Sequence, residues 1–290
     1  MNQINLFIKL TRLKKPIGYM LLFWPCVWGL TLVYDFSGDL KKYIFYFILF
    51  FMGSILMRSA GCIVNDILDR KFDKKVYRTR DRPIASGKIS VRLAWVYAAV
   101  LCILAFFVLI NFNYFTIFIA LASMPLAFSY PLMKRFTYWP QLFLGVTFNY
   151  GLILGWTSVS NEIVLIPLIF YFGAIFWTLG YDTIYGFQDI KDDEIIGLKS
   201  TSIKFKSNPY IFLKICYTTF YLTLIIIGIL MEFDKYYFLF SLLIFLHLFI
   251  LQIHKLNIKK ASSCLDVFKS NNFLGLLVFS NILLGKILNG

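Results

Sequence analysis

Two groups of acidic side chains share one spacing that suits metal binding. Asp69 and Asp73 are four residues apart, Asp189 and Asp193 repeat that spacing 120 residues later, and Asn65 lies four residues before the first pair. Residues four apart share one face of a helix, where two carboxylates repel each other. A divalent cation removes this repulsion, and Mg²⁺ prefers a few carboxylates together with phosphate oxygens and water. The motifs therefore predict Mg²⁺ ions on both sides of one diphosphate, held by Asn65, Asp69, Asp73, Asp189 and Asp193.

The alternative interpretation is that both motifs are ordinary solvated loops. A single motif of this spacing fits that interpretation about as well as it fits a metal site. Two motifs in matching helix positions, with Asn65 in register with the first, favour the metal site.

Basic side chains near the first motif are candidates for contact with diphosphate oxygens. They are Arg70, Lys71, Arg78, Arg80 and Arg82. Arg presents a bidentate fork and Lys a point charge, although such residues also set membrane topology or contact anionic lipid. We predict diphosphate contacts for Arg78 and Arg82.

The segments that must position these motifs are strongly apolar. Hydrophobic residues make up 59% of the 290 residues and charged residues 15%, with a mean hydropathy of +0.73. Soluble domains average roughly 45–50% apolar and about 25% charged residues. The composition therefore excludes a soluble globular enzyme, and its 32 Phe and 18 Tyr exclude a disordered chain. It predicts an all-α polytopic protein of the lipid bilayer.

Nine segments have the length of about 20 residues that a membrane-spanning helix needs. They lie approximately at 16–34, 43–67, 91–110, 113–133, 139–157, 162–184, 209–230, 236–254 and 271–288. We expect one domain over 1–290, with spans one to four and five to eight as a possible repeat and a ninth span added. Both acidic motifs then follow even-numbered spans and lie on one side of the membrane.

The formal charge of +14 comes from 29 basic and 15 acidic residues. Most of the basic residues fall before the first span or after even-numbered spans, which predicts a cytoplasmic N-terminus by the positive-inside rule. The charge is thereby explained without a nucleic-acid partner. Five Cys residues without a CxxC pair indicate neither a disulfide framework nor a zinc site.

Four segments extend these motifs in order along the chain. They are KPIGYMLLFWP (15–25), GCIVNDILDRKFDKKVYRTRDRPIASG (61–87), SYPLMKRFTYWPQ (129–141) and YDTIYGFQDIKDDEIIGLKST (181–201). They resemble the successive signatures of 4-hydroxybenzoate polyprenyltransferases, in the UbiA superfamily of intramembrane aromatic prenyltransferases. The resemblance runs from about residue 8 to 206, and its NDxxDxxxD motif marks the superfamily as a whole. The YDTxY and YPxMKR segments are more specific to the 4-hydroxybenzoate branch.

The resemblance implies an activity and a fold. The activity is transfer of a polyprenyl group from polyprenyl diphosphate to the carbon ortho to the hydroxyl of 4-hydroxybenzoate, an early step of ubiquinone synthesis that needs Mg²⁺. The catalytic residues implied are Asp69, Asp73, Asp189 and Asp193, which with Asn65 hold metal and diphosphate. The fold implied is nine helices around a central cavity open sideways to lipid. No obligate protein partner is expected.

Three further basic residues are candidates for substrate binding. Arg58 lies seven residues before Asn65, so about 10 Å deeper on nearly the same helix face, and a charge at such depth usually marks function. It could bind the acceptor carboxylate, pair with Asp69 or snorkel to an interface. Arg135, after the fourth span, is a candidate for the acceptor carboxylate or the diphosphate, unless it only sets topology. Lys199, six residues after the second motif, is a diphosphate candidate.

Two rival functions and one location follow from the same sequence. A transporter suits nine spans and a repeat, but would place ionisable groups near the midplane in broken helices. A sister prenyltransferase with another quinone or haem acceptor would share the acidic motifs. The first residues, MNQINLFIKLTRLKKP, show no small-residue cleavage site, so we expect a multi-pass protein of the bacterial cell inner membrane.

Overall fold

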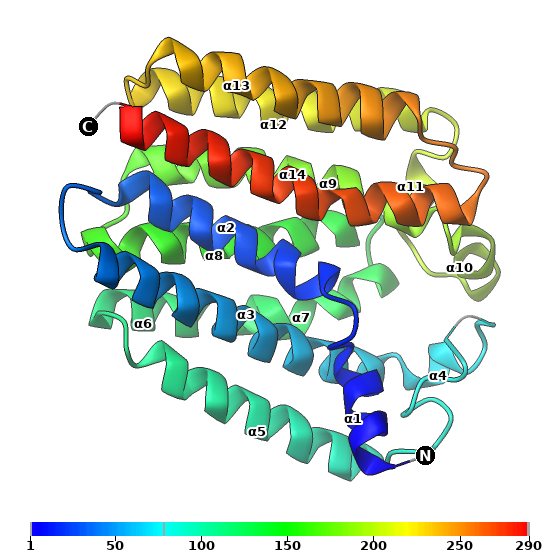
Figure 1. Cartoon of the computed structure of the whole chain (residues 1–290). Coiled ribbons are helices and arrows are strands. Elements are labelled where there is room, and N and C mark those ends of the chain that lie inside the picture. Colours follow the sequence, from blue (N-terminus) through cyan, green and yellow to red (C-terminus); the bar gives the residue numbers. More distant parts are fainter. Residues whose placement is uncertain (1, 78, 289–290) are drawn as a thin grey trace.

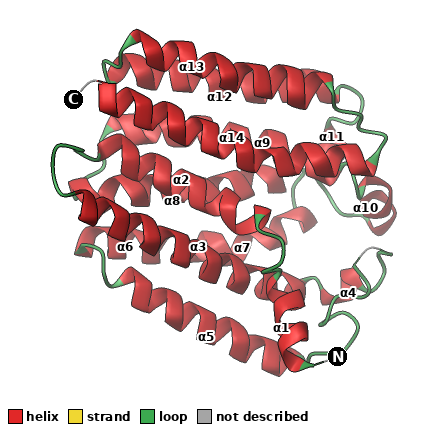
Figure 2. Ribbon diagram, in the orientation of Figure 1, coloured by secondary structure: helices red, strands yellow, loops and turns green. Residues whose placement is uncertain are grey.

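The computed structural model describes residues 2–77 and 79–288. All regular structure in these ranges is helical, as Figure 2 shows. Eight helical rods are long and apolar enough to cross a membrane, and α2 (Ile17–Val33) is a shorter apolar helix. The predicted all-α polytopic fold with about nine apolar helices is confirmed.

The nine apolar rods run roughly parallel to one another in the bundle (Figure 1). After α2 they are α3 (Leu40–Leu68), α5 (Val91–Leu109), a rod of α6 (Tyr114–Ala122), α7 (Met124–Ser129) and η1 (Tyr130–Arg135), α8 (Pro140–Ser160), α9 (Leu165–Gly186), α12 (Pro209–Leu230), a rod of α13 (Lys235–Leu246) and η2 (His247–His254), and α14 (Ala261–Leu288). Four short helices complete the chain: α1 (Gln3–Thr11), α4 (Arg70–Asp73), α10 (Ile190–Ile196) and α11 (Thr201–Lys204).

The helix α14 begins ten residues before the span expected at 271–288. Its first turns carry Asp266 and Lys269, which are exposed. Hydropathy identifies only the part of a helix that suits lipid, so a helix that continues beyond the apolar segment is predicted too short.

The helices α2 and α8 pack closely against each other in the bundle. A Cβ added at Gly29 would overlap the carbonyl oxygen of Leu152, and one at Gly155 would overlap that of Cys26. Small residues at such crossings let two helix backbones approach within a membrane protein. The first and fifth rods of the bundle, α2 and α8, are therefore joined along their backbones, although they are far apart in sequence.

Aromatic side chains hold α9 against its neighbours. The ring centroids of Trp28 and Trp177 are 4.9 Å apart, and Phe220 stacks against both. The indole of Trp28 donates to the carbonyl oxygen of Gly275 at 3.0 Å. Buried aromatic pairs of this kind add stabilisation beyond the area that they bury. They fix α2, α9, α12 and α14, and so the helix from which the second acidic motif extends.

The short helices gather at one end of the bundle. Figure 1 places α1, α4, α10 and α11 at that end, and the C-terminus of α14 at the opposite end. The two acidic motifs therefore lie at the same end as the N-terminal helix. This agrees with the sidedness that the basic segments predict.

Candidate active site

The first acidic motif lies where α3 gives way to α4. The long helix ends at Leu68, and Asp69 adopts φ −89° and ψ 0° before the short helix begins. The backbone still bonds in four-residue steps: Asp69 N–H donates to Asn65 O at 2.9 Å, and Asp73 N–H donates to Asp69 O at 2.8 Å. The helix is therefore interrupted at Asp69. The four-residue spacing of the side chains survives the break.

The second acidic motif repeats this local design. The helix α9 ends at Gly186, and Asp189 adopts φ −113° and ψ 4° immediately before α10. Asp193 N–H donates to Asp189 O at 2.9 Å. In both motifs the first aspartate thus occupies the junction between a long apolar helix and a short helix at the bundle end.

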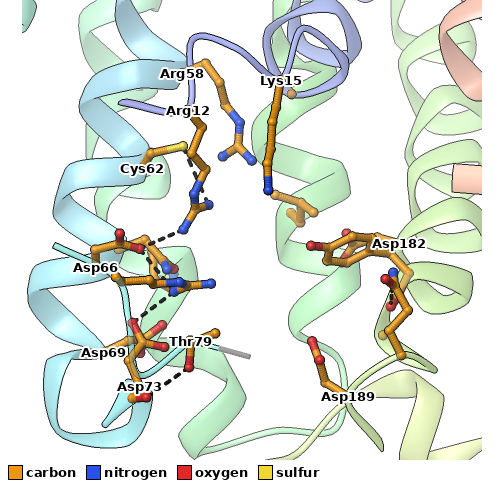
Figure 3. A pocket seen from close by; sticks show the side chains of 18 of the residues that line it. Arg12, Lys15, Arg58, Cys62, Asp66, Asp69, Asp73, Thr79, Asp182 and Asp189 are labelled. Carbon is orange, nitrogen blue, oxygen red and sulfur yellow. Dashed lines mark hydrogen bonds and ion pairs between the residues drawn. The ribbon is translucent and has the colours of Figure 1, made fainter. Parts of the chain in front are cut away.

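One cavity of about 1020 Å³ brings the two motifs together. Figure 3 shows Asp69 and Asp73 on one wall and Asp189 on the other. The predicted site residues that line this cavity are Arg58, Asn65, Asp69, Asp73, Arg82, Asp189, Asp193 and Lys199. Arg78 lies outside the described residues. Arg135 is absent from the described lining.

Buried ion pairs surround the first motif. Arg82 Nη1 lies 2.9 Å from Asp73 Oδ2 and 3.1 Å from Asp66 Oδ1, and Arg12 Nη2 lies 2.7 Å from Asp66 Oδ1. Arg12 has φ 58°, the left-handed region that non-glycine residues rarely adopt. Asp66 is 2% exposed. It therefore joins the end of α1, the end of α3 and the loop that carries Arg82.

Two consecutive basic residues, Lys134 and Arg135, take different positions around Asp69. The ammonium of Lys134 pairs with Asp69 Oδ2 and lines the cavity. Arg135 Nη2 lies 3.7 Å from Asp69 Oδ1 and 2.8 Å from the carbonyl oxygen of Leu68, with its guanidinium over the ring of Phe72. Arg135 therefore holds the backbone and carboxylate of the motif from behind. This position does not favour the direct substrate contact predicted for it.

The loop after the second motif is tied to the segment that carries Lys134. Lys199 N–H donates to the carbonyl oxygen of Lys134 at 2.9 Å, and Lys199 Nζ donates to that of Phe136 at 3.3 Å. Gln141 accepts a hydrogen bond from Thr201 N–H at 2.9 Å. These bonds fix the loop against α8 and η1. They bring Lys199 to the same cavity as Asp69.

Arg58 occupies the inner part of the cavity. Its guanidinium lies over the ring of Phe148, 5.4 Å from the ring centroid, and packs against Gly18, where a Cβ would lie 2.8 Å from Nε. No carboxylate of the described residues lies within ion-pair distance of it, and the partners of Asp69 are Lys134 and Arg135. Neither pairing with Asp69 nor snorkelling to an interface describes this position. The charge instead faces the cavity.

The carboxylates of Asp69 and Asp73 in the first motif are suited to bind a divalent cation. Burial raises the pKa of Asp73, nearby Asp66 and Asp69 raise it further, and Arg82 opposes them. Asp69 Oδ1 is buried and accepts no hydrogen bond from the described residues. Within residues 2–77 and 79–288, no three His, Cys, Asp or Glu side chains gather closely enough to bind a metal alone. This arrangement fits Mg²⁺, which binds through one or two carboxylates completed by substrate phosphates and water.

Sequence reasoning missed several residues of the cavity wall. Arg12, Lys15, Lys134 and Asp182 line the cavity, although none of them was predicted as a site residue. The adjacent pair Lys134 and Arg135 could have pointed to Lys134. Side chains of neighbouring residues point in different directions, so only one of the two would face the site. Nothing in the sequence indicates that α1 folds against α3 and brings Arg12 to Asp66.

We expect the Asp66→Asn variant to be destabilised by about 3 kcal/mol, the lower end of the cost of breaking a buried ion pair. The amide leaves Arg12 without its ion-pair partner and removes one of the two carboxylates that hold Arg82. Denaturant unfolding in detergent measures the loss. Asp266→Asn, an exposed change of the same kind, should stay within about 0.5 kcal/mol. Equal stability of the two variants would contradict this role for Asp66.

Sequence relatives agree with this architecture. The profile of the UbiA prenyltransferase family matches residues 22–277. The mitochondrial 4-hydroxybenzoate polyprenyltransferase of Rattus norvegicus is 43% identical over 284 residues, which cover 97% of this chain and 75% of that protein. The protein of the same name from Arabidopsis thaliana is 39% identical over 287 residues, covering 98% of this chain and 69% of that protein. The resemblance to this group of enzymes is confirmed.

Solved structures share the fold. The apo structure of a UbiA homolog from Aeropyrum pernix K1 has a TM-score of 0.73 at 23% identity, covering 94% of this chain and 97% of that chain. A UbiA homolog from Archaeoglobus fulgidus, solved bound to GPP and Mg²⁺, has a TM-score of 0.72 at 17% identity, covering 96% and 99%. The profile match, the close relatives and the common fold together show that this chain belongs to the UbiA prenyltransferase family.

Proposed function

We propose that this protein transfers a polyprenyl group from polyprenyl diphosphate to the ring carbon ortho to the hydroxyl of 4-hydroxybenzoate, releasing diphosphate, as an early step of ubiquinone synthesis. The observation that carries the proposal is the single cavity into which both acidic motifs open. Its deeper wall is apolar and aromatic, with Leu21, Leu144, Phe148 and Phe268. A hydrocarbon tail with a diphosphate head matches such a cavity.

The acidic residues hold the metal in this mechanism. Asp69 and Asp73 face Asp189 across the cavity. Asn65 and Asp193 line the same cavity. These oxygen donors suit Mg²⁺, which when bound stabilises the charge of the departing diphosphate. The Mg²⁺ reported with GPP in the Archaeoglobus homolog supports this assignment.

The basic residues hold the diphosphate. Arg82 and Lys134 are already held beside Asp73 and Asp69 by ion pairs, and Lys199 lines the same cavity from the other motif. Their charges orient the diphosphate so that the allylic carbon points into the cavity. Arg135 contributes by positioning Asp69. A diphosphate contact of Arg78 belongs to the same proposal.

Arg58 receives the carboxylate of 4-hydroxybenzoate. It lies about 16 Å of helix rise deeper than Asp69, at 1.5 Å per residue. No carboxylate of the described residues lies within ion-pair distance of it, and Asp182 acts on it only at longer range. A carboxylate ligand supplies the missing negative charge by a bidentate hydrogen bond. The acceptor ring is then placed between Arg58 and the diphosphate.

We expect Arg58→Ala to raise the KM for 4-hydroxybenzoate by at least about 30-fold, as loss of a bidentate charged contact of about 2 kcal/mol or more requires. Binding of the prenyl diphosphate should change little, because its contacts lie toward the cavity mouth. Initial rates with each substrate varied in turn measure the difference.

Two companion variants separate charge from shape at Arg58. Arg58→Lys keeps the charge and should recover part of the affinity. Gly18→Val leaves Arg58 in place but crowds its guanidinium, since even a Cβ at Gly18 would contact Nε, and it should also raise the KM for 4-hydroxybenzoate. A normal KM in Arg58→Ala would remove Arg58 from acceptor binding.

A direct assay tests the proposed function. Membranes containing the protein are incubated with Mg²⁺, a polyprenyl diphosphate and radiolabelled 4-hydroxybenzoate, and the lipid-soluble product is counted. Product with 4-hydroxybenzoate supports the proposal, and product only with another quinone or haem acceptor indicates a sister prenyltransferase. Accumulation of unchanged label inside vesicles would indicate a transporter.

The location is proposed from the charge pattern. We place the cavity mouth and the N-terminus on the cytoplasmic face of a bacterial inner membrane, because the basic segments lie at that end of the bundle. The relatives described above are named as mitochondrial proteins. Cysteine labelling of residues in the loop after α4 and in the turn between α2 and α3 tests the sidedness.

A further inference from the structure

Asp182 differs from the carboxylates around the first acidic motif, which line the same cavity. It lies on α9, lines the cavity, and makes no hydrogen bond or ion pair through its side chain in the described part of the chain. Asp66, Asp69 and Asp73, by contrast, are held by basic residues. The two acidic motifs and their ion pairs therefore leave Asp182 without a role.

The helices place Asp182 between the acceptor-binding arginine and the metal-binding aspartates. Asp182 precedes Asp189 by seven residues, or about 10 Å of helix rise, whereas Arg58 precedes Asp69 by eleven residues, or about 16 Å. Figure 3 shows the same order: Arg58 is deepest, Asp182 follows on the opposite wall, and Asp189 lies at the mouth. Asp182 therefore lies at a depth between Arg58 and the metal-binding aspartates, on the opposite wall.

The acceptor in the proposed function, 4-hydroxybenzoate, carries one group for Arg58 and one for Asp182. Its carboxylate and its hydroxyl lie at opposite ends of one ring, so a carboxylate at Arg58 directs the hydroxyl toward the level of Asp182. The ortho carbon beside that hydroxyl then faces the allylic carbon of the diphosphate. Resting on the proposed function, we infer that Asp182 accepts the hydrogen bond of the acceptor hydroxyl and takes its proton as the ring attacks.

The proton and electron balance is complete without another reactant. The bond between the allylic carbon and the diphosphate oxygen breaks, and diphosphate leaves with its electron pair. The ortho carbon bonds to the allylic carbon while the O–H electron pair forms a ring ketone and the proton moves to Asp182 Oδ. The ring carbon then loses its hydrogen as a proton to diphosphate, and the ketone oxygen regains a proton from Asp182. The hydroxyl is restored and one proton leaves with diphosphate.

The surroundings of Asp182 suit a group that exchanges a proton. Arg58 on α3 is the charged group with which it interacts, and Tyr130 of η1 and Tyr181 of α9 lie within its electrostatic reach. Arg12 at the end of α1 and Lys14 and Lys15 in the turn after it also line the cavity. The helices α8 and α14 add the apolar rings of Phe148 and Phe268 to this wall of the cavity. An anionic acceptor and Arg58 neutralise each other, which leaves Asp182 free to bind the hydroxyl.

The test compares Asp182→Asn with wild-type protein in membranes containing Mg²⁺ and prenyl diphosphate. The amide can still bind a hydroxyl but cannot take a proton, so kcat should fall by about 100-fold or more, the contribution of a general base. The KM for 4-hydroxybenzoate should change by less than about threefold, because Arg58 still binds the carboxylate. Asp266→Asn, an exposed matched change, should leave both constants unchanged.

A second acceptor makes the test independent of how well the variant folds. The hydroxyl of 3-fluoro-4-hydroxybenzoate ionises more readily and one ortho carbon remains free. The rate of the variant relative to wild type should rise about tenfold or more with this acceptor, because an ionised hydroxyl needs no base. With 4-hydroxybenzoate, kcat of the variant should rise with pH as the hydroxyl itself ionises, beyond the pH at which the wild-type rate levels off.

The outcomes separate this inference from the function on which it rests. Wild-type protein that forms no product from 4-hydroxybenzoate overturns both. Active wild-type protein together with an Asp182→Asn variant of near-normal kcat overturns the role of Asp182 alone. A slow variant whose relative rate is the same with both acceptors also overturns it, since a purely structural role predicts that result.

Discussion

EDTA will abolish prenyl transfer by this protein in washed membranes, and added Mg²⁺ will restore it. Asp69, Asp73, Asp189 and Asp193 line one cavity, and a diphosphate would add further negative charge among them. Arg82 and Lys134, the basic residues nearest these carboxylates in the cavity, are already paired with Asp73 and Asp69. Without a divalent cation, the repulsion opposes both the binding of the diphosphate and the build-up of charge on it as it leaves.

The measurement is product formation against free Mg²⁺ after metal removal. EDTA already saturated with Mg²⁺ is the control, and unfolding in detergent shows whether the protein survives the treatment. The Mg²⁺ concentration for half activity should rise as the pH is lowered, because protons compete with the cation for Asp73, whose pKa is raised by burial. Full turnover in metal-free membranes would contradict the two-motif mechanism.

Features that depend only on residues close together in the chain could be predicted from the sequence. In the described part of the chain, the nine apolar segments became eight helical rods long enough to cross a membrane and one shorter apolar helix, since lipid demands helices that satisfy their own backbone. The two acidic motifs were paired by a four-residue spacing that depends only on helix geometry. Because both follow even-numbered spans, connectivity alone placed them at one end of the bundle, where the cavity joins them.

Features that depend on packing between distant segments could not be predicted. The chain bends at Asp69 and at Asp189, so that short helices fold against the ends of long ones. Which of Lys134 and Arg135 faces the cavity depends on the 3₁₀ geometry of η1, which hydropathy does not reveal. The ion pair between Arg12 and Asp66 joins residues 54 positions apart through the docking of α1. Such contacts are set by tertiary structure. The sequence shows that each residue is charged but not which residue it pairs with.

Asp69→Asn and Asp189→Asn should each lower turnover by at least about 100-fold, as expected for residues that act as a unit. Each substitution removes one carboxylate charge from the metal site while nearly keeping the side-chain shape. The two residues occupy equivalent junctions on opposite walls of the cavity, so one Mg²⁺–diphosphate cluster would contact both. Once either ligand is lost the cluster is already disabled, and the double variant should be little worse than the poorer single variant.

A double-mutant cycle on initial rates at saturating Mg²⁺ decides between one site and two. The four proteins are compared at equal amounts in the membrane, with Asp192→Asn as the matched control, because Asp192 neighbours the second motif but is not among the described residues that line the cavity. Losses in activation free energy that add would indicate two independent sites, since additivity is the behaviour of sites that share no partner. A fully active Asp189→Asn protein would remove the second motif from the mechanism and leave its likeness to the first as a property of the fold.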